Sequence, residues 1–130
     1  MDRVSWKIYK HPTRANEFTR EKETPFVPLS DKLKNTIVLP GRNFTIVYPA
    51  ARNTDREIRE YYDAGGEPLT VNDLLYTLYT FYQQPVTKDE IKKWEYPKDA
   101  KTLADGMEGL HFFEGLVEIS PDVYGLELGS

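Results

Sequence analysis

Residues 70–83 limit the possible folds of this chain more than any other segment. The side-chain oxygen of Thr70 can accept a hydrogen bond from the backbone N–H three residues later, and the helix dipole favours Asp73 at that position. Apolar side chains then recur with the period of an α-helix, at Val71, Leu74, Leu75, Leu78, Tyr79 and Tyr82. We therefore predict a core helix over residues 71–83, which Pro85 ends.

After this helix, the sequence predicts a second, shorter helix and a closing hairpin. Thr87 and Glu90 occupy the positions of another capping box, and the helix that starts there continues through Ile91 and Trp94. Residues 111–120 and 124–128 have the composition of two strands around a turn at residues 120–123.

An earlier hairpin is predicted by residues 36–39 and 44–48, because a Pro-Gly turn signal separates two β-branched stretches. For residues 53–63, a short helix and an extended ribbon remain alternatives. The order hairpin, helix pair, hairpin predicts an α+β fold, a mostly antiparallel sheet with the helix pair packed on one face.

The first residues of the chain have a different character from the rest. Val4, Trp6 and Ile8 alternate with polar residues and have Tyr9 beside them, which predicts a short strand or an anchoring arm. Residues 10–23 show no apolar period and predict a linker. We therefore expect an N-terminal arm and linker over residues 1–23 and one globular domain over residues 24–130.

Charge is distributed unevenly along the 130 residues. Residues 1–59 carry 12 Lys and Arg against 7 Asp and Glu, whereas residues 60–130 carry 5 against 14. The basic region could follow a nucleic-acid backbone, with Trp6, Tyr9 and Phe18 to stack on bases. The acidic remainder would repel phosphate, so nucleic-acid binding through the basic N-terminal region is the least favoured of the alternative functions.

Residues of the types that usually act in catalysis or bind metals are few in this chain. Without cysteine, the chain has no disulfide, thiolate nucleophile or iron–sulfur cluster, and it fits a reducing compartment. Its two histidines, His11 and His111, lie far apart and lack the spacing of zinc ligands. Glu114 and Glu118 could converge with Phe112 on one strand face, but a solvated acidic face is the simpler interpretation. We expect no catalytic residue, no metal and no cofactor.

No apolar run approaches the roughly 18 to 20 residues that span a bilayer. Residues 1–10 are charged where a signal peptide would be apolar. We therefore expect an intracellular protein, cytoplasmic or nuclear, without a membrane partner.

Aromatic residues are concentrated between Tyr61 and Tyr96. Tyr76 and Phe81 lie off the main apolar stripe of the predicted helix, so that helix needs cover on two sides. The cover can be intramolecular, or it can be a partner, because tyrosine and tryptophan are favoured at interface centres. The candidate interaction residues are Val4, Trp6, Ile8, Tyr9, Tyr76, Phe81 and Trp94.

The function predicted from these features is a noncatalytic protein-interaction or structural domain that associates with itself or with a protein partner. A homodimer would form if two chains exchanged their N-terminal arms across the linker. The alternative is a small-ligand-binding protein or an enzyme whose pocket is lined by the aromatic cluster.

From residue 24 to residue 130 the chain resembles an uncharacterised domain family, abundant in mushroom-forming fungi and known only as a domain of unknown function. The matching stretches are residues 24–29, 66–75, 84–90 and 113–116. The chain departs from the family at residues 110–112, where members often carry Arg and Asp, and the N-terminal arm is extra. The resemblance supports the fold and implies no activity. The tyrosine-rich, cysteine-free composition is also similar to that of short orphan proteins of large DNA viruses.

Overall fold

The computed structural model describes residues 3–18, 26–52 and 55–130. The helices in these residues are η1 (Pro12–Arg14), α1 (Asp31–Lys34), α2 (Val71–Tyr82), α3 (Lys88–Lys93) and η2 (Leu103–Met107), η marking 3-10 helices. The strands are β1 (Val4–Ser5), β2 (Asn16–Phe18), β3 (Phe26–Pro28), β4 (Ile37–Leu39), β5 (Phe44–Pro49), β6 (Glu57–Tyr62), β7 (Leu69–Thr70), β8 (Phe112–Ser120) and β9 (Val123–Gly129). The predicted α+β class is confirmed. None of the described helices is long and apolar enough to cross a lipid bilayer.

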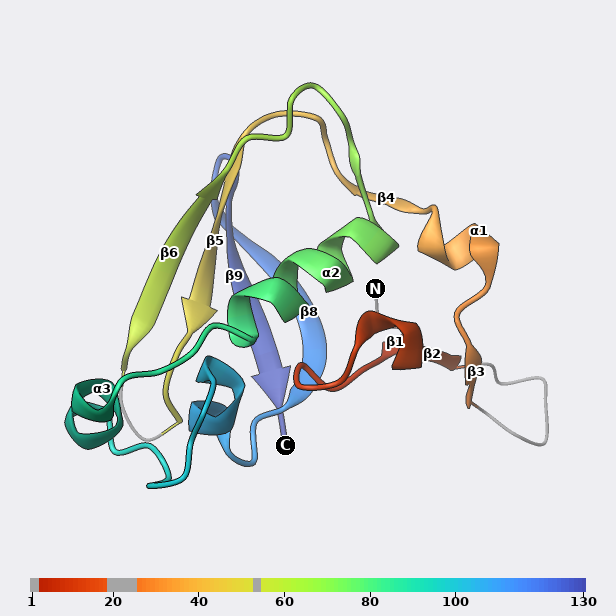
Figure 1. The fold of residues 1–130 in the computed structure, drawn as a ribbon. Helices are drawn as coiled ribbons and strands as arrows, with labels where there is room; N and C mark the ends of the chain where they lie inside the picture. The colour runs from red at the N-terminus through yellow and green to blue at the C-terminus, as the bar shows by residue number, and fades with distance from the viewer. Residues whose placement is uncertain (1–2, 19–25, 53–54) are drawn as a thin grey trace.

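The main sheet has the strand order β6-β5-β9-β8 (Figure 1). Neighbouring strands are antiparallel except β5 and β9, which run parallel and join the two halves of the sheet. The predicted ribbon alternative for residues 53–63 is correct where β6 forms, and residues 53–54 lie outside the described residues.

The predicted hairpin between residues 36–39 and 44–48 is wrong, although both strands exist. Strand β4 pairs with β7, and β5 pairs with β6. A Cβ atom added to Gly41 would lie only 2.5 Å from the carbonyl oxygen of Gly66. The loop between β4 and β5 and the loop between β6 and β7 therefore cross closely here, and this crossing separates β4 from β5. Strand β6 is the better partner because Ile58 and Tyr62 extend the apolar face of β5.

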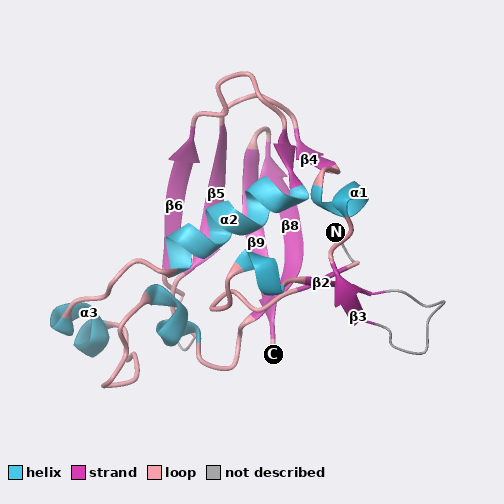
Figure 2. Ribbon diagram, turned by 45° about the vertical axis from the view of Figure 1, so that its right-hand side comes forward, coloured by secondary structure: helices cyan, strands magenta, loops and turns pink. Residues whose placement is uncertain are grey.

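Helix α2 covers the inner face of the main sheet, as Figures 1 and 2 show. Both hydrogen bonds of its predicted capping box are present, as they are at α3. The ring of Tyr48 on β5 stacks on Phe81 of α2, with centroids 3.6 Å apart. The predicted core residues Leu74, Leu75 and Leu78 are fully buried. Helix α3 lies to one side, where Ile91 and the cap residue Trp94 are partly buried against the core.

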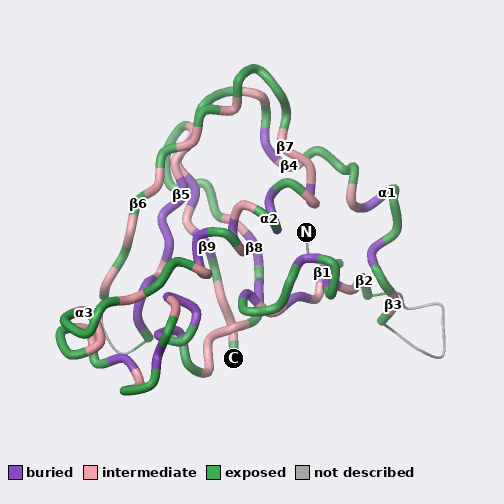
Figure 3. The backbone as a smooth tube through the Cα atoms, in the orientation of Figure 1, coloured by how far each residue is buried: buried purple, intermediate pink, exposed green. Residues whose placement is uncertain are grey.

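The N-terminal residues belong to the same core, which corrects the expectation of an arm separate from the globular domain; the short-strand alternative is correct at β1. Val4, Trp6 and Ile8 are 8%, 2% and 0% exposed. Figure 3 shows buried stretches of the backbone at β1. The backbone bonds Phe113 N–H to Trp6 C=O and Ile8 N–H to His111 C=O hold this segment at the start of β8. Alternation of three large apolar residues therefore marks core contacts made by the chain itself.

The predicted linker over residues 10–23 is also wrong in its described part, since η1 and β2 occupy it. Strand β2 pairs with β1 and β3 in a small antiparallel sheet. The buried carboxylate of Glu17 accepts hydrogen bonds from Arg3 Nη2 at 3.0 Å and the Ser30 backbone N–H at 2.6 Å. These contacts are polar and long-range, so they leave no apolar period in the sequence. Residues 19–23 lie outside the described residues.

Strands β8 and β9 form the predicted closing hairpin, with register shifts between Phe113 and Gly115 and between Glu118 and Ser120. Phe112 lies opposite Gly129, and Glu118 lies opposite Tyr124. Because Gly129 and Tyr124 are an odd number of residues apart, Phe112 and Glu118 lie on opposite faces. The first bulge thus removes the shared face predicted for Glu118 and Phe112.

Candidate functional site

A groove of about 600 Å³ lies between strand β6 and helix α2. Two-residue alternation places Glu60 and Tyr62 of β6 on the inner face of the sheet. Residues three and four apart on α2 form the opposite wall. The residues of that wall are Tyr76, Thr77, Thr80, Phe81 and, just beyond the helix, Gln84.

Two lining residues of the groove, Tyr62 and Phe81, rest on the buried Tyr48 ring of β5. The hydroxyl groups of Tyr48 and Tyr62 are 2.6 Å apart and share a hydrogen bond. Burial raises the pKa of Tyr48 far above that of an exposed tyrosine, and it also raises the pKa of Tyr62. Both phenols are therefore uncharged near neutral pH. Among the described residues that line the groove, Glu60 alone carries a charge.

The outer face of the main sheet lies on the side away from α2 and η2 (Figures 1 and 2), and it carries both apolar and charged side chains. Tyr61, Val117 and Ile119 are 68%, 46% and 56% exposed there. Ile119 sits in the second bulge of β8 and lies across Gly125, where an added Cβ would be 3.1 Å from Ile119 Cδ1. The bulge therefore turns an isoleucine onto this face.

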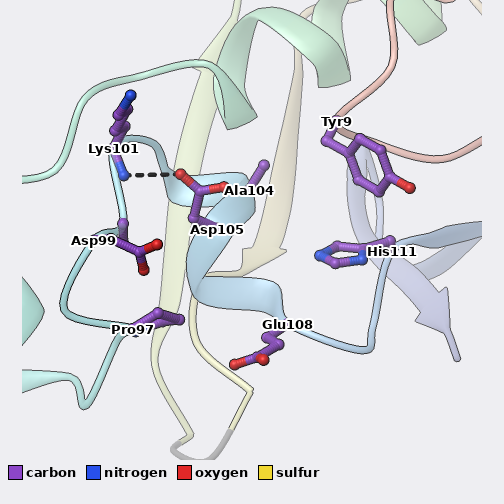
Figure 4. A pocket seen from close by; sticks show the side chains of 9 residues that line it. Tyr9, Pro97, Asp99, Lys101, Ala104, Asp105, Glu108 and His111 are labelled. Carbon is purple, nitrogen blue, oxygen red and sulfur yellow. Dashed lines mark hydrogen bonds between the residues drawn. The ribbon is translucent and has the colours of Figure 1, made fainter.

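A second hollow, of about 520 Å³, lies beside His111 (Figure 4). The His111 ring meets Tyr9 edge to face, with centroids 4.9 Å apart. On the other side, the Asp105 carboxylate accepts hydrogen bonds from the backbone N–H groups of Lys101 and Thr102, at 2.8 and 3.0 Å. Desolvation opposes ionisation of Asp105, but these hydrogen bonds and nearby His111 outweigh it and lower its pKa.

Asp105 is therefore a fixed carboxylate that caps the start of η2, and it is poorly suited to donate a proton. Asp99 and Glu108 add two more carboxylates around the hollow and Lys101 adds one amine, so acidic side chains outnumber lysine there. In the described ranges, no three histidine or carboxylate side chains are grouped so that they could hold a metal ion.

Trp94 belongs to a separate cluster around Arg56. The Arg56 guanidinium donates to Glu90 Oε2 at 2.8 Å and to the Tyr96 hydroxyl at 3.0 Å. It also lies 4.6 Å from the centroid of the Trp94 ring. The hydrogen bond from Arg56 lowers the pKa of Glu90. Trp94 thus connects α3 to the segment before β6.

No protein family, curated protein or solved structure matches this chain. The resemblance to the fungal domain family and the likeness to viral proteins therefore stay predictions. The features that bear on function are therefore the β6–α2 groove, the outer face of the main sheet and the hollow beside His111.

The structure does not gather the seven predicted interaction residues on one surface. Tyr76 and Phe81 line the β6–α2 groove, whereas Tyr9 lines the hollow beside His111 and Trp94 lies in the Arg56 cluster. The remaining three, Val4, Trp6 and Ile8, are in the core.

The sequence reasoning missed Glu60, Val117 and Ile119 as surface residues of interest. Alternation over residues 57–62 was the available signal for Glu60, once the ribbon alternative is chosen over the helix. The bulge that exposes Ile119 on the outer face has no local signal in residues 116–120, because it depends on the register with β9.

Proposed function

We propose that this chain is a noncatalytic protein-interaction domain that self-associates through the outer face of its main sheet. The observation that carries the proposal is the exposure of large side chains on a face that lies away from the helices, Val117 and Ile119 on the edge strand β8 and Tyr61 on the opposite edge strand β6. Val117 and Ile119 are neighbours beside Gly125, and exposed apolar side chains grouped in this way are typical of interaction sites.

A second copy of the chain is the favoured partner because a twisted sheet packs well on another sheet with nearly aligned strands. A two-fold axis would bring the same residues together from both copies, so the side chains of Ile119 and Val117 would be buried in each copy. Arg59 on β6 and Glu127 on β9 flank the apolar group with charges of opposite sign. Such a mixed rim allows a copy to be matched without like-charge repulsion.

This interface replaces the arm exchange expected from the sequence. Val4, Trp6 and Ile8 already pack in the core of their own chain, so they are satisfied without a partner. We place the homodimer inside the cell, in the cytoplasm or nucleus, because a chain without cysteine suits a reducing compartment.

Light scattering of the purified chain tests the proposal. We expect the mass of two chains for the unchanged protein and the mass of one chain for Ile119→Asp and Val117→Asp. Ile37→Asp is the matched control, because Ile37 is 62% exposed on β4, outside the main sheet, and this variant should remain a dimer. A monomer for the unchanged chain, or a dimer for Ile119→Asp, would refute the proposed interface.

The hollow beside His111 supports a second candidate function, the binding of a small cationic ligand. Its observation is that Asp99, Asp105 and Glu108 line the hollow of about 520 Å³ together with the Tyr9 and His111 rings, against one basic side chain, Lys101. A thermal-shift screen with amines tests it, since a ligand that binds only the folded state raises the melting temperature. Asp99→Asn should weaken any such shift.

A further inference from the structure

We infer that the β6–α2 groove binds an extended peptide segment, which pairs with the free edge of β6 and carries a lysine or arginine beside Glu60. This site goes beyond self-association, because it uses the edge and the inner side of the sheet and a different partner. It is one form of β-strand addition, in which backbone bonds supply affinity and alternate side chains supply specificity.

The backbone of β6 has an open edge. β6 is the last strand in its sheet and pairs with β5 on one side. The Ala50 N–H donates to the Arg56 carbonyl at 2.9 Å, so the even-numbered residues of β6 direct their backbone groups towards β5. Those of Glu57, Arg59 and Tyr61 therefore point away from the sheet, and no backbone bond joins them to another described residue.

The groove begins where this edge meets the inner face. Side chains of an added strand that face inward would lie beside Ile58, Glu60 and Tyr62, which share that face. Across the opening stand Tyr76 and Thr80 of α2. An inward side chain would therefore contact a strand on one side and a helix on the other.

The charge of the groove selects the partner. Glu60 is the sole charged side chain among the described lining residues, and the other surfaces are phenol, phenyl, hydroxyl and amide groups. A basic side chain beside Glu60 would complement it, and apolar side chains two residues before and after would meet Ile58 and Tyr62. The expected partner is an extended segment with the pattern apolar, any, basic, any, apolar.

A second copy of β6 is a poorer occupant. Two antiparallel registers would pair most of β6 with β6 of a second copy. In both of them the inner faces of the two sheets would form one continuous face. One sets Arg59 opposite Arg59, and the other sets Glu60 opposite Glu60. Like charges directly opposite each other destabilise a strand pair. The groove therefore favours a basic segment over its own strand.

Fluorescence anisotropy with two labelled peptides tests the inference. In the first, valine alternates with threonine around a central lysine; in the second, glutamate replaces that lysine. All measurements use the Ile119→Asp background, so that loss of self-association is not mistaken for loss of peptide binding. We expect the lysine peptide to bind about five- to tenfold more tightly than the glutamate peptide. Glu60→Lys should reverse this preference.

The edge is tested separately with Arg59→Pro, whose matched control is Arg59→Ala. The Arg59 N–H points away from β5, so proline there keeps the existing ladder and removes an outward donor. We expect Arg59→Pro to weaken the lysine peptide about tenfold relative to Arg59→Ala. Thr80→Trp, which fills the groove from the α2 side, should weaken it similarly. Circular dichroism verifies that each variant is folded.

Three results would overturn the inference. They are no saturable binding of the lysine peptide up to about 1 mM, an unchanged peptide preference in Glu60→Lys, and equal affinity of Arg59→Pro and Arg59→Ala. Failure of the dimer proposal is distinguishable, because it changes the solution mass and leaves peptide binding by the Ile119→Asp chain intact.

Discussion

Trp6 and Phe113 meet edge to face with their ring centroids 6.3 Å apart, and the Phe113 backbone N–H donates to the Trp6 carbonyl at 2.9 Å. Residues more than 100 positions apart are thus joined by both side chain and backbone. The Trp6 indole N–H also donates to the Lys10 carbonyl at 2.9 Å. This contact makes the N-terminal segment a structural part of the domain.

We predict that Trp6→Ala lowers the free energy of unfolding by about 3–5 kcal/mol, because it removes a buried ring and leaves a cavity. Urea denaturation measures the loss. Tyr9→Ala is the control, since Tyr9 is exposed and should cost under about 1 kcal/mol. A small effect of Trp6→Ala combined with a change in solution mass would instead support the arm-exchange dimer.

Leu78→Ala should cost about 2–5 kcal/mol, because Leu78 is fully buried where α2 meets the sheet. The same urea titration applies. Thr77→Ala, one residue earlier and partly exposed, is expected to change stability by less than about 1 kcal/mol. Equal effects of the two changes would mean that α2 faces the sheet in a different orientation.

The pair between Arg56 and Glu90 should make stability depend on acid pH. The hydrogen bond from Arg56 lowers the pKa of Glu90 below its ordinary 4.5, so the pair stabilises the fold above that pH. Glu90→Gln should cost about 0.5–1.5 kcal/mol at neutral pH. The cost should disappear as the pH falls through the lowered pKa. Glu108→Gln, which removes an exposed carboxylate outside this cluster, is the matched control and should cost less than about 0.5 kcal/mol at neutral pH.

Buried tyrosines should make the fold sensitive to alkali. Burial raises the pKa of Tyr48 and of Tyr82 above the ordinary 10.0, so the folded state holds protons that the unfolded chain releases. Stability is therefore fully present below pH 10.0 and falls as the pH rises above it. Urea denaturation at rising pH should show this loss, and Tyr48→Phe should reduce its slope.

Tyr48→Phe should itself cost about 1 kcal/mol at neutral pH, because the Tyr62 hydroxyl loses its partner. Tyr9→Phe, which removes an exposed hydroxyl, is the control for loss of a phenol hydroxyl and should leave the stability at neutral pH unchanged. If Tyr48→Phe unfolded in alkali as steeply as the unchanged chain, Tyr48 would not be a source of the pH dependence.

Local features were predictable from the order of the residues. The capping boxes at Thr70 and Thr87 place donor and acceptor three residues apart, so the hydrogen bonds form wherever the helix starts. The stripe containing Leu74 and Leu78 likewise follows from helical period alone. The closing hairpin is local in the same sense, since one short turn joins its strands.

Sequence alone therefore determined helices α2 and α3, the closing hairpin and the α+β class of this protein. Only the tertiary structure decided that β5 pairs with β6, that Trp6 enters the core and that Ile119 turns outward. Each of these outcomes depends on the relative free energies of contacts between distant segments, which no periodicity within one segment encodes. The β6–α2 groove arose in the same way, because a strand and a helix from separate segments form its two walls.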